Sequence, residues 1–373
     1  MKRKLIGLLV VVVVGALAVP ALAITDGTPD GEGNSAEYPY VGQLLFYVPD
    51  AIDPRFGPED PGAWFNCTGT LIDESVVLTA GHCTFAVGDG IDSTLTDPSN
   101  PSPLVDTDDD GESDNGAGGT DVWINFSQEP NYEGFPPSTD YFDNPDDTTG
   151  PDDNTNEDRF LDREDWLDGP DATDWIRGTA WPIPFYNDAA FLLFDLGVVV
   201  LNPMASETVP LGPYPELVEL GALDKYEAPG SGRFKAKDRF TAVGYGLREI
   251  VPFFEPNYGA GENDQRYIAD GLMVIDGTGV LGFGPTFPYD AALVFSNSPG
   301  KAHTGGTCFG DSGGPIFDAD GDFAAVTSFG LNQNCKGTGG GYRLDQADDQ
   351  DWLDQGLSGG GWDSHPDGDS PWQ

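Results

Sequence analysis

Cys308-Phe309-Gly310-Asp311-Ser312-Gly313-Gly314-Pro315 is the stretch that says most about this 373-residue chain, and it has a partner far upstream in Leu78-Thr79-Ala80-Gly81-His82-Cys83. A serine hydroxyl is a weak nucleophile at neutral pH and becomes reactive when a base within hydrogen-bond reach takes its proton. The chain has three histidines, and His82 is the one that stands in a small-residue segment beside a cysteine. The two segments therefore predict a nucleophile, Ser312, and its base, His82.

The segment around Ser312 is rich in glycine, at positions 310, 313 and 314. Glycine lets the backbone turn sharply and brings N–H groups close to a bound molecule without interference from a Cβ atom. We expect the N–H groups of Gly310 and Ser312 to form an oxyanion hole, which holds the charge that develops on a carbonyl oxygen under attack.

These two segments, in this order, resemble the base and nucleophile motifs of the trypsin/chymotrypsin family of secreted serine proteases. The resemblance implies an all-β fold of two six-stranded antiparallel barrels, with the site at their interface and a short C-terminal helix near 346–355, as in many bacterial members. It also implies a serine endopeptidase that acts through an acyl-enzyme and needs no cofactor for its chemistry. An esterase on the same site is an alternative within enzymes. A catalytically inactive, calcium-dependent binding or adhesion protein on this scaffold is the alternative outside them.

A carboxylate must orient the base, and the family order places it between His82 and Ser312. The segment Asn187-Asp188-Ala189-Ala190-Phe191-Leu192-Leu193-Phe194 puts an acid before an apolar run that is typical of a buried strand. It resembles the family's segment around the catalytic aspartate, so Asp188 is the predicted third member. Asp195, at the far end of the same run, is the competing candidate, and Asp188 as a plain turn residue is the other interpretation.

The first 23 residues have the features of a secretion signal. A basic start at Lys2-Arg3-Lys4 precedes an apolar stretch and the small-residue site Ala21-Leu22-Ala23. An uncleaved membrane anchor is the alternative. Cleavage after Ala23 would free Ile24, and the resemblance implies that its ammonium pairs with Asp311 to order the oxyanion loop. We therefore expect a secreted protein that signal peptidase itself activates.

The four cysteines of an exported chain suggest two disulfides, for which three pairings exist. Cys67 and Cys83 fit adjacent strands of a hairpin, whereas Cys308 and Cys335 bracket the serine loop and the far wall of the implied pocket. We predict the pairs Cys67–Cys83 and Cys308–Cys335. Metal binding by these cysteines is not expected, because export favours their oxidation.

Substrate preference follows from alignment with the family. The base of the primary pocket falls at Gly306, and its walls at Ser328-Phe329-Gly330 and around Gly340. No charge stands at the base, so we predict cleavage after large apolar residues. Ser328 is expected to support both the substrate backbone and the catalytic aspartate.

The formal net charge of −46 makes nucleic acids and anionic membranes poor partners. Proteins or peptides are the expected substrates, and the chain is expected to be a monomer without stable membrane association once the signal is removed. Such acidity also fits salt adaptation or bound calcium. Asp106, Asp108 and Asp110 stand at alternating positions before Gly111, as in the first half of a calcium-binding loop, but Ala117 stands where the loop's closing Glu is expected. An acidic solvated loop is the alternative.

Short apolar runs alternate with Gly, Pro and Asp turns after the signal, which is typical of an all-β chain. The protease domain is predicted to span 24–356, with a largely irregular acidic insertion at about 92–174 and a flexible acidic, Gly-rich tail at 357–373. The predicted strands are 41–48, 65–72, 75–79, 122–126, 190–196, 240–245, 272–275, 293–295, 315–317, 323–329 and 341–344.

Overall fold

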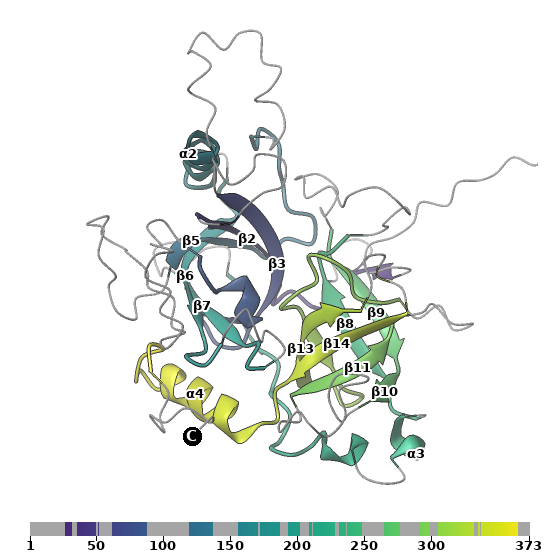
Figure 1. Cartoon of the computed structure of the whole chain (residues 1–373). Coiled ribbons are helices and arrows are strands. Elements are labelled where there is room, and N and C mark those ends of the chain that lie inside the picture. The colour runs from purple at the N-terminus through teal and green to yellow at the C-terminus, as the bar shows by residue number, and fades with distance from the viewer. Residues whose placement is uncertain are drawn as a thin grey trace, which may run out of the picture.

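The computed structural model describes residues 27–31, 36–49, 51, 62–87, 119–136, 156–170, 172–186, 193–201, 209–210, 212–227, 231–235, 237–247, 265–276, 291–297, 305–331, 335 and 337–364. Within these ranges the chain folds mainly into antiparallel strands that form two barrels side by side (Figure 1).

The first barrel is a closed ring of six strands in the order β2-β3-β4-β7-β6-β5. Its apolar residues point inward and build a core that includes Leu44, Val77, Ile124 and Val199. Such runs of β-branched and large apolar residues favour strands with a buried face. The strands are β2 (Val41–Val48), β3 (Ala63–Leu71), β4 (Val76–Thr79), β5 (Gly119–Asn125), β6 (Trp175–Pro182) and β7 (Gly197–Leu201).

The second barrel is built from a sheet in the order β1-β9-β8-β12-β13-β14-β11-β10. β9 ends at Leu272 and β10 begins at Val274, so one bent segment pairs with β8 at its start and with β11 at its end. The chain thus passes at Met273 from β9, on one side of the sheet, to β10 at the opposite edge. The strands are β1 (Thr28–Pro29), β8 (Phe240–Gly244), β9 (Tyr267–Leu272), β10 (Val274–Asp276), β11 (Ala292–Ser296), β12 (Pro315–Phe317), β13 (Phe323–Gly330) and β14 (Thr338–Arg343).

This pair of antiparallel barrels, followed by a short C-terminal helix, is a chymotrypsin-like fold. The predicted fold class is therefore confirmed. The helix α4 (Ala347–Leu357) follows β14 and lies beneath the first barrel in Figure 1. The described residues also include three shorter helical elements: the 3-10 turns η1 (Gly81–Cys83) and η6 (Asp224–Tyr226), and α3 (Gly232–Lys235).

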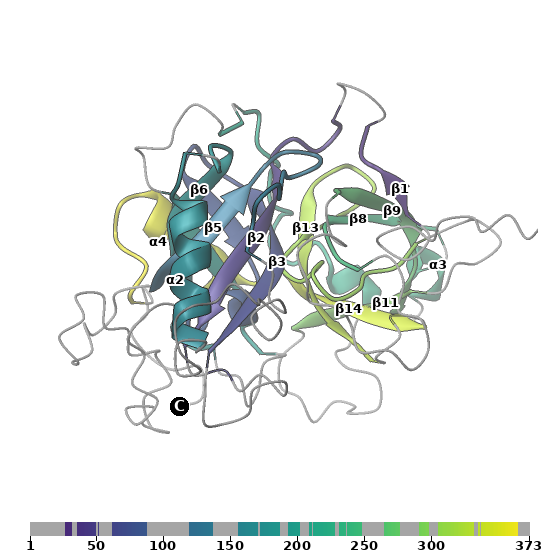
Figure 2. The same cartoon turned by 90° about the horizontal axis from the view of Figure 1, so that it is seen from above.

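The segment predicted as a largely irregular insertion contains two regular elements. β5 is a full member of the first barrel, and α2 (Asn156–Leu167) lies against the outside of that barrel (Figure 2). The buried ring of Phe160 packs on Tyr47 and Trp64, with ring centroids 4.4 and 5.9 Å away. β5 covers most of the strand predicted at 122–126, whereas α2 was not predicted, because scattered aromatic residues in an acidic sequence give little periodic signal.

The predicted tail is also partly packed. Trp362 is buried and meets the buried Trp352 of α4 edge to face, with ring centroids 5.1 Å apart. Gln355 donates hydrogen bonds to the carbonyls of Gly361 and Ser364. The boundary at 356 therefore cuts through a folded unit, and the remainder of the tail after 364 lies outside the described residues.

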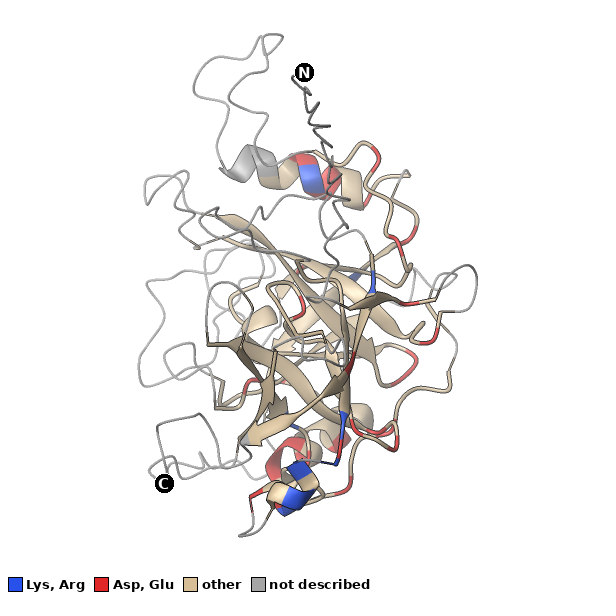
Figure 3. Cartoon of the chain, turned by 90° about the vertical axis from the view of Figure 1, so that its right-hand side faces the viewer, with Lys and Arg blue, Asp and Glu red and all other residues tan. Residues whose placement is uncertain are grey.

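Acidic side chains lie mostly on loops and helices, whereas the strands carry few charges (Figure 3). None of the described helices is long and apolar enough to cross a membrane.

A buried ion pair joins the start of the described chain to both barrels. Arg266 and Asp30 are 1% and 0% exposed, and their Nε and Oδ2 atoms are 2.6 Å apart. Arg266 also donates to the carbonyl of Val41 at 2.6 Å and to the hydroxyl of Tyr245 at 3.0 Å. The described segment 27–31 is thus fixed at the seam between the barrels.

Candidate active site

His82 lies on η1, directly after β4, and is oriented by a buried carboxylate. Its backbone N–H donates to Asp195 Oδ1 at 2.9 Å, and its Nδ1 lies 3.0 Å from both carboxylate oxygens. Asp195 is fully buried and also accepts a 2.5 Å hydrogen bond from Ser328 Oγ. Such a carboxylate holds the ring in one tautomer and stabilises it when it is protonated.

The turn that carries His82 depends on Gly81. A Cβ atom there would lie 2.5 Å from the ring of Tyr186 and 3.0 Å from the backbone nitrogen of Leu196. Only a glycine allows η1 to approach the segment that holds Asp195 this closely.

The assignment of the orienting acid to Asp188 is corrected by these contacts. Asp195 occupies the place on His82 Nδ1 that was predicted for Asp188, which lies outside the described residues. The apolar run 190–196, predicted as a strand, is not one where it is described, because β7 begins only at Gly197. Gly197 pairs with Thr79, three residues before His82, and this register brings Asp195 to the imidazole. The β-branched run Val198-Val199-Val200 predicts a strand directly after Asp195, and this pattern could have favoured Asp195 as the orienting acid from the sequence.

The loop that carries Ser312 is fastened to the first barrel by Thr68 of β3. The N–H of Thr68 donates to the carbonyl of Ser312 at 2.8 Å, and its hydroxyl donates to the carbonyl of Gly310 at 2.8 Å. Gly313 has a φ of +77°, and a Cβ atom there would collide with the hydroxyl of Thr79. Sequence reasoning missed Thr68 and Thr79, because a threonine inside a strand gives no sign of contacts across a domain interface.

Two N–H groups of this loop are free of bonds to the described backbone. Asp311 N donates to the carbonyl of Cys308 at 3.1 Å, and Gly313 N to that of Thr327 at 2.7 Å. By contrast, no described backbone carbonyl accepts from the N–H of Gly310 or of Ser312. These are the two donors that the sequence predicted for an oxyanion hole.

Asp311 is a second buried carboxylate beside the site. Its oxygens accept hydrogen bonds from the N–H groups of Gly246, at 2.7 Å, and Cys308, at 2.8 Å. Burial nevertheless raises the pKa of Asp311 to about 7, because these two backbone bonds offset only part of the cost of removing the charge from water. A nearby cation would stabilise the ionised form. Ile24, the predicted source of that cation, lies outside the described residues.

His82 and Ser312 line a single pocket of about 700 Å³ between the barrels, together with Gly310, Ser328, Phe329 and Gly330. None of the described residues that line it is Lys, Arg, Asp or Glu.

Two glycines that were predicted to line this pocket do not. Gly340 faces the ring of Phe329, which occupies the space that a side chain at 340 would take. Gly306 is backed by the buried Asn297, whose Cβ atom would lie 2.6 Å from a Cβ atom at 306. Thr307, next to Gly306, and Phe329, whose ring covers Gly340, line the cavity instead.

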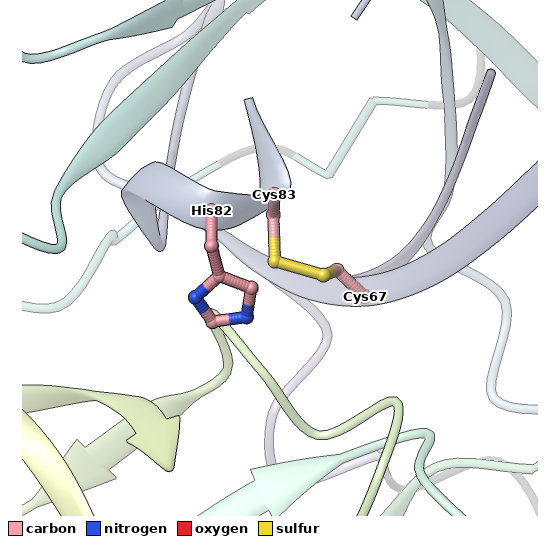
Figure 4. Close-up of side chains that lie close together, drawn as sticks. All are labelled: Cys67, His82 and Cys83. Carbon is pink, nitrogen blue, oxygen red and sulfur yellow. A yellow bond between two sulfur atoms is a disulfide. The ribbon is translucent and has the colours of Figure 1, made fainter. Parts of the chain in front are cut away.

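Both predicted disulfides are present, Cys67–Cys83 and Cys308–Cys335. The first lies beside the ring of His82 (Figure 4). Cys67, Cys83 and His82 are close enough to suggest a metal site, but sulfurs joined in a disulfide are not thiolate ligands. The candidate calcium ligands Asp106, Asp108 and Asp110 lie outside the described residues.

No protein-family model matches the chain. No curated protein sequence matches it either. Similar solved structures include an HL collagenase, with 16% identity and a TM-score of 0.47 over 89% of this chain and 96% of that one. They also include a mutant of human heparin binding protein, with 13% identity and a TM-score of 0.43 over 87% and 94% of the two chains. Likenesses this weak carry no inference, so the fold assignment rests on the strand topology.

Proposed function

We propose that this chain is a serine endopeptidase that cleaves peptide bonds through an acyl-enzyme intermediate. In this mechanism Ser312 Oγ attacks the scissile carbonyl while His82 takes its proton. The N–H groups of Gly310 and Ser312 stabilise the oxyanion, and His82 then returns the proton to the leaving amine. A water molecule, activated in the same way by His82, then attacks the ester of the acyl-enzyme. This step releases the acid product and restores the Ser312 hydroxyl.

One observation carries this proposal: Nδ1 of His82 is held by a buried carboxylate in the pocket that also contains Ser312. Asp195 makes three hydrogen bonds, to two groups of His82 and to Ser328. Burying a charge is costly unless it is paired, so a histidine that gains a proton during the reaction suits this position.

We propose that activation follows from export. Removal of the signal after Ala23 would free the ammonium of Ile24, which would pair with the carboxylate of Asp311. The raised pKa of Asp311 supports this, because a cation beside the buried carboxylate would stabilise its ionised form. The two disulfides support an oxidising destination outside the cytoplasm.

Large apolar residues remain the proposed class at P1, the residue before the scissile bond. The described pocket lining offers no ion-pair partner to a charged side chain. An apolar P1 side chain would contact the ring of Phe329 rather than the bare glycines predicted from the sequence.

Labelling with a fluorophosphonate probe tests the proposal. The secreted protein is expected to react at Ser312, and both Ser312→Ala and His82→Ala should abolish labelling. Ser358→Ala, an exposed serine after α4, is a matched control that should label normally. Turnover of peptide as well as ester substrates separates a peptidase from an esterase. A folded protein that neither labels nor cleaves would support an inactive binding protein instead.

A further inference from the structure

The half of the pocket contributed by the first barrel is strongly aromatic. Phe65 of β3 is 38% exposed, one of eight large apolar side chains that are open to solvent among the residues the structure describes. It stacks on the buried Phe46 of β2, with ring centroids 5.7 Å apart and planes inclined by 25°. The first-barrel residues that line the pocket are Phe46, Val48, Ala51, Phe65, Asn66, Cys67, His82, Phe85 and Ala86. An exposed apolar patch beside a reactive site marks a surface where a ligand binds.

The chemistry decides which part of a substrate reaches this patch. The carbonyl under attack must lie at the oxyanion loop, and the second barrel supplies the remaining walls around Ser328, Phe329 and Gly330. The leaving amine must lie at His82, which returns its proton. The chain that follows the scissile bond therefore leaves over the first barrel, past His82.

The apolar patch of Phe65 and Phe46 is fixed in position relative to His82. Phe65 stands two residues before Cys67, and the disulfide joins Cys67 to Cys83, the neighbour of His82. β3 also lies beside β13 of the second barrel in Figures 1 and 2. A rigid support means that little ordering is needed when a substrate side chain packs on the patch.

We propose that Phe65, supported by Phe46, forms an apolar subsite that selects a large apolar residue within the first two positions after the scissile bond. This inference rests on the proposed function and adds the substrate class on the leaving-group side. The subsite disfavours both acidic and basic residues there, because they would lose hydration without gaining a charged partner among the described lining residues.

Partitioning of the acyl-enzyme tests the subsite directly. One ester substrate loads the enzyme, and added amines compete with water for the same acyl group, so the product ratio is independent of the total rate. Phenylalaninamide and leucinamide probe the first position, with glycinamide and argininamide as their references. The dipeptide amides Gly-Phe-amide and Gly-Gly-amide probe the second.

We expect the apolar amines to capture the acyl group roughly tenfold better than their references at one of these positions, as for other apolar pockets. Phe65→Ala should reduce that preference roughly fivefold, and Phe65→Leu should retain most of it. Leu357→Ala is the matched control, because this leucine on α4 is 42% exposed and does not line the pocket.

Equal capture of the apolar amines and of their references at both positions would overturn the subsite while leaving the protease intact. A preference that survives in Phe65→Ala would overturn the role of Phe65. Failure to form any acyl-enzyme would instead overturn the proposed function, and the subsite with it.

Discussion

Asp195 and Asp311 are both buried beside the candidate site, yet they are satisfied in different ways. Asp195 accepts bonds from the N–H and Nδ1 of His82 and from Ser328 Oγ, so its partners are all in place. Asp311 has two backbone donors, and burial still raises its pKa to about 7. The base is therefore organised by contacts within the described fold, whereas the proposed activation would bring a cation to the loop of the nucleophile.

The largest effect expected at the loop of the nucleophile concerns that cation. A chain with one extra residue before Ile24 should lose about 10³-fold or more in kcat/KM, because misplacing both oxyanion donors costs more than the roughly 10²–10³-fold typical of one. Asp311→Asn should cause a similar loss. N-terminal sequencing and peptide hydrolysis measure this. Full activity of a chain whose Ile24 is blocked would show that the Asp311 side of the site needs no added cation, contrary to the proposed activation.

The stability of the uncleaved chain should depend on pH through Asp311. Its folded-state pKa of about 7 exceeds the ordinary 3.8, so folding is penalised once the carboxylate ionises. The penalty is absent below pH 3.8, grows as the pH rises and is complete above pH 7, reaching about 4 kcal/mol. Urea unfolding of uncleaved wild-type and Asp311→Asn chains at pH 4 and 8 isolates this contribution. The chain that begins at Ile24 should show less of it.

Arg266→Leu should destabilise the seam that fixes residues 27–31. It would leave Asp30 buried without its ion-pair partner, at a cost of about 3 kcal/mol. Lys225→Ala removes a more exposed pair to Asp238, with atoms 3.8 Å apart, and should change the free energy of unfolding by about 0.5 kcal/mol or less. Similar values for the two variants in chemical denaturation would argue against a structural role for the buried pair.

The smallest expected effect concerns the pocket wall. Phe329→Ala would uncover Gly340 and enlarge the slot, so cleavage should shift by roughly tenfold toward tryptophan over leucine at P1. Competing peptide substrates measure the ratio, with Leu331→Ala, an exposed neighbour, as the control. An unchanged ratio would mean that Phe329 does not limit the slot.

The features that depend on neighbouring residues could be predicted from the sequence. The strand 41–48, the disulfides and the glycines of the serine loop each depend on short-range pattern or on a quoted motif. The identification of Asp195 as the orienting acid depended on the register between β7 and β4, which the sequence does not display. Thr68 and the cover of Gly340 by Phe329 depend on packing between distant segments, which no run of residues displays.

The most direct test of the account compares two aspartates on peptide substrates. Asp195→Asn should lower kcat by about 10⁴-fold, because His82 would lose the carboxylate that fixes its tautomer. Asp188→Asn should retain nearly full activity. The opposite result, with activity lost on replacing Asp188 and kept on replacing Asp195, would contradict the site described for this chain.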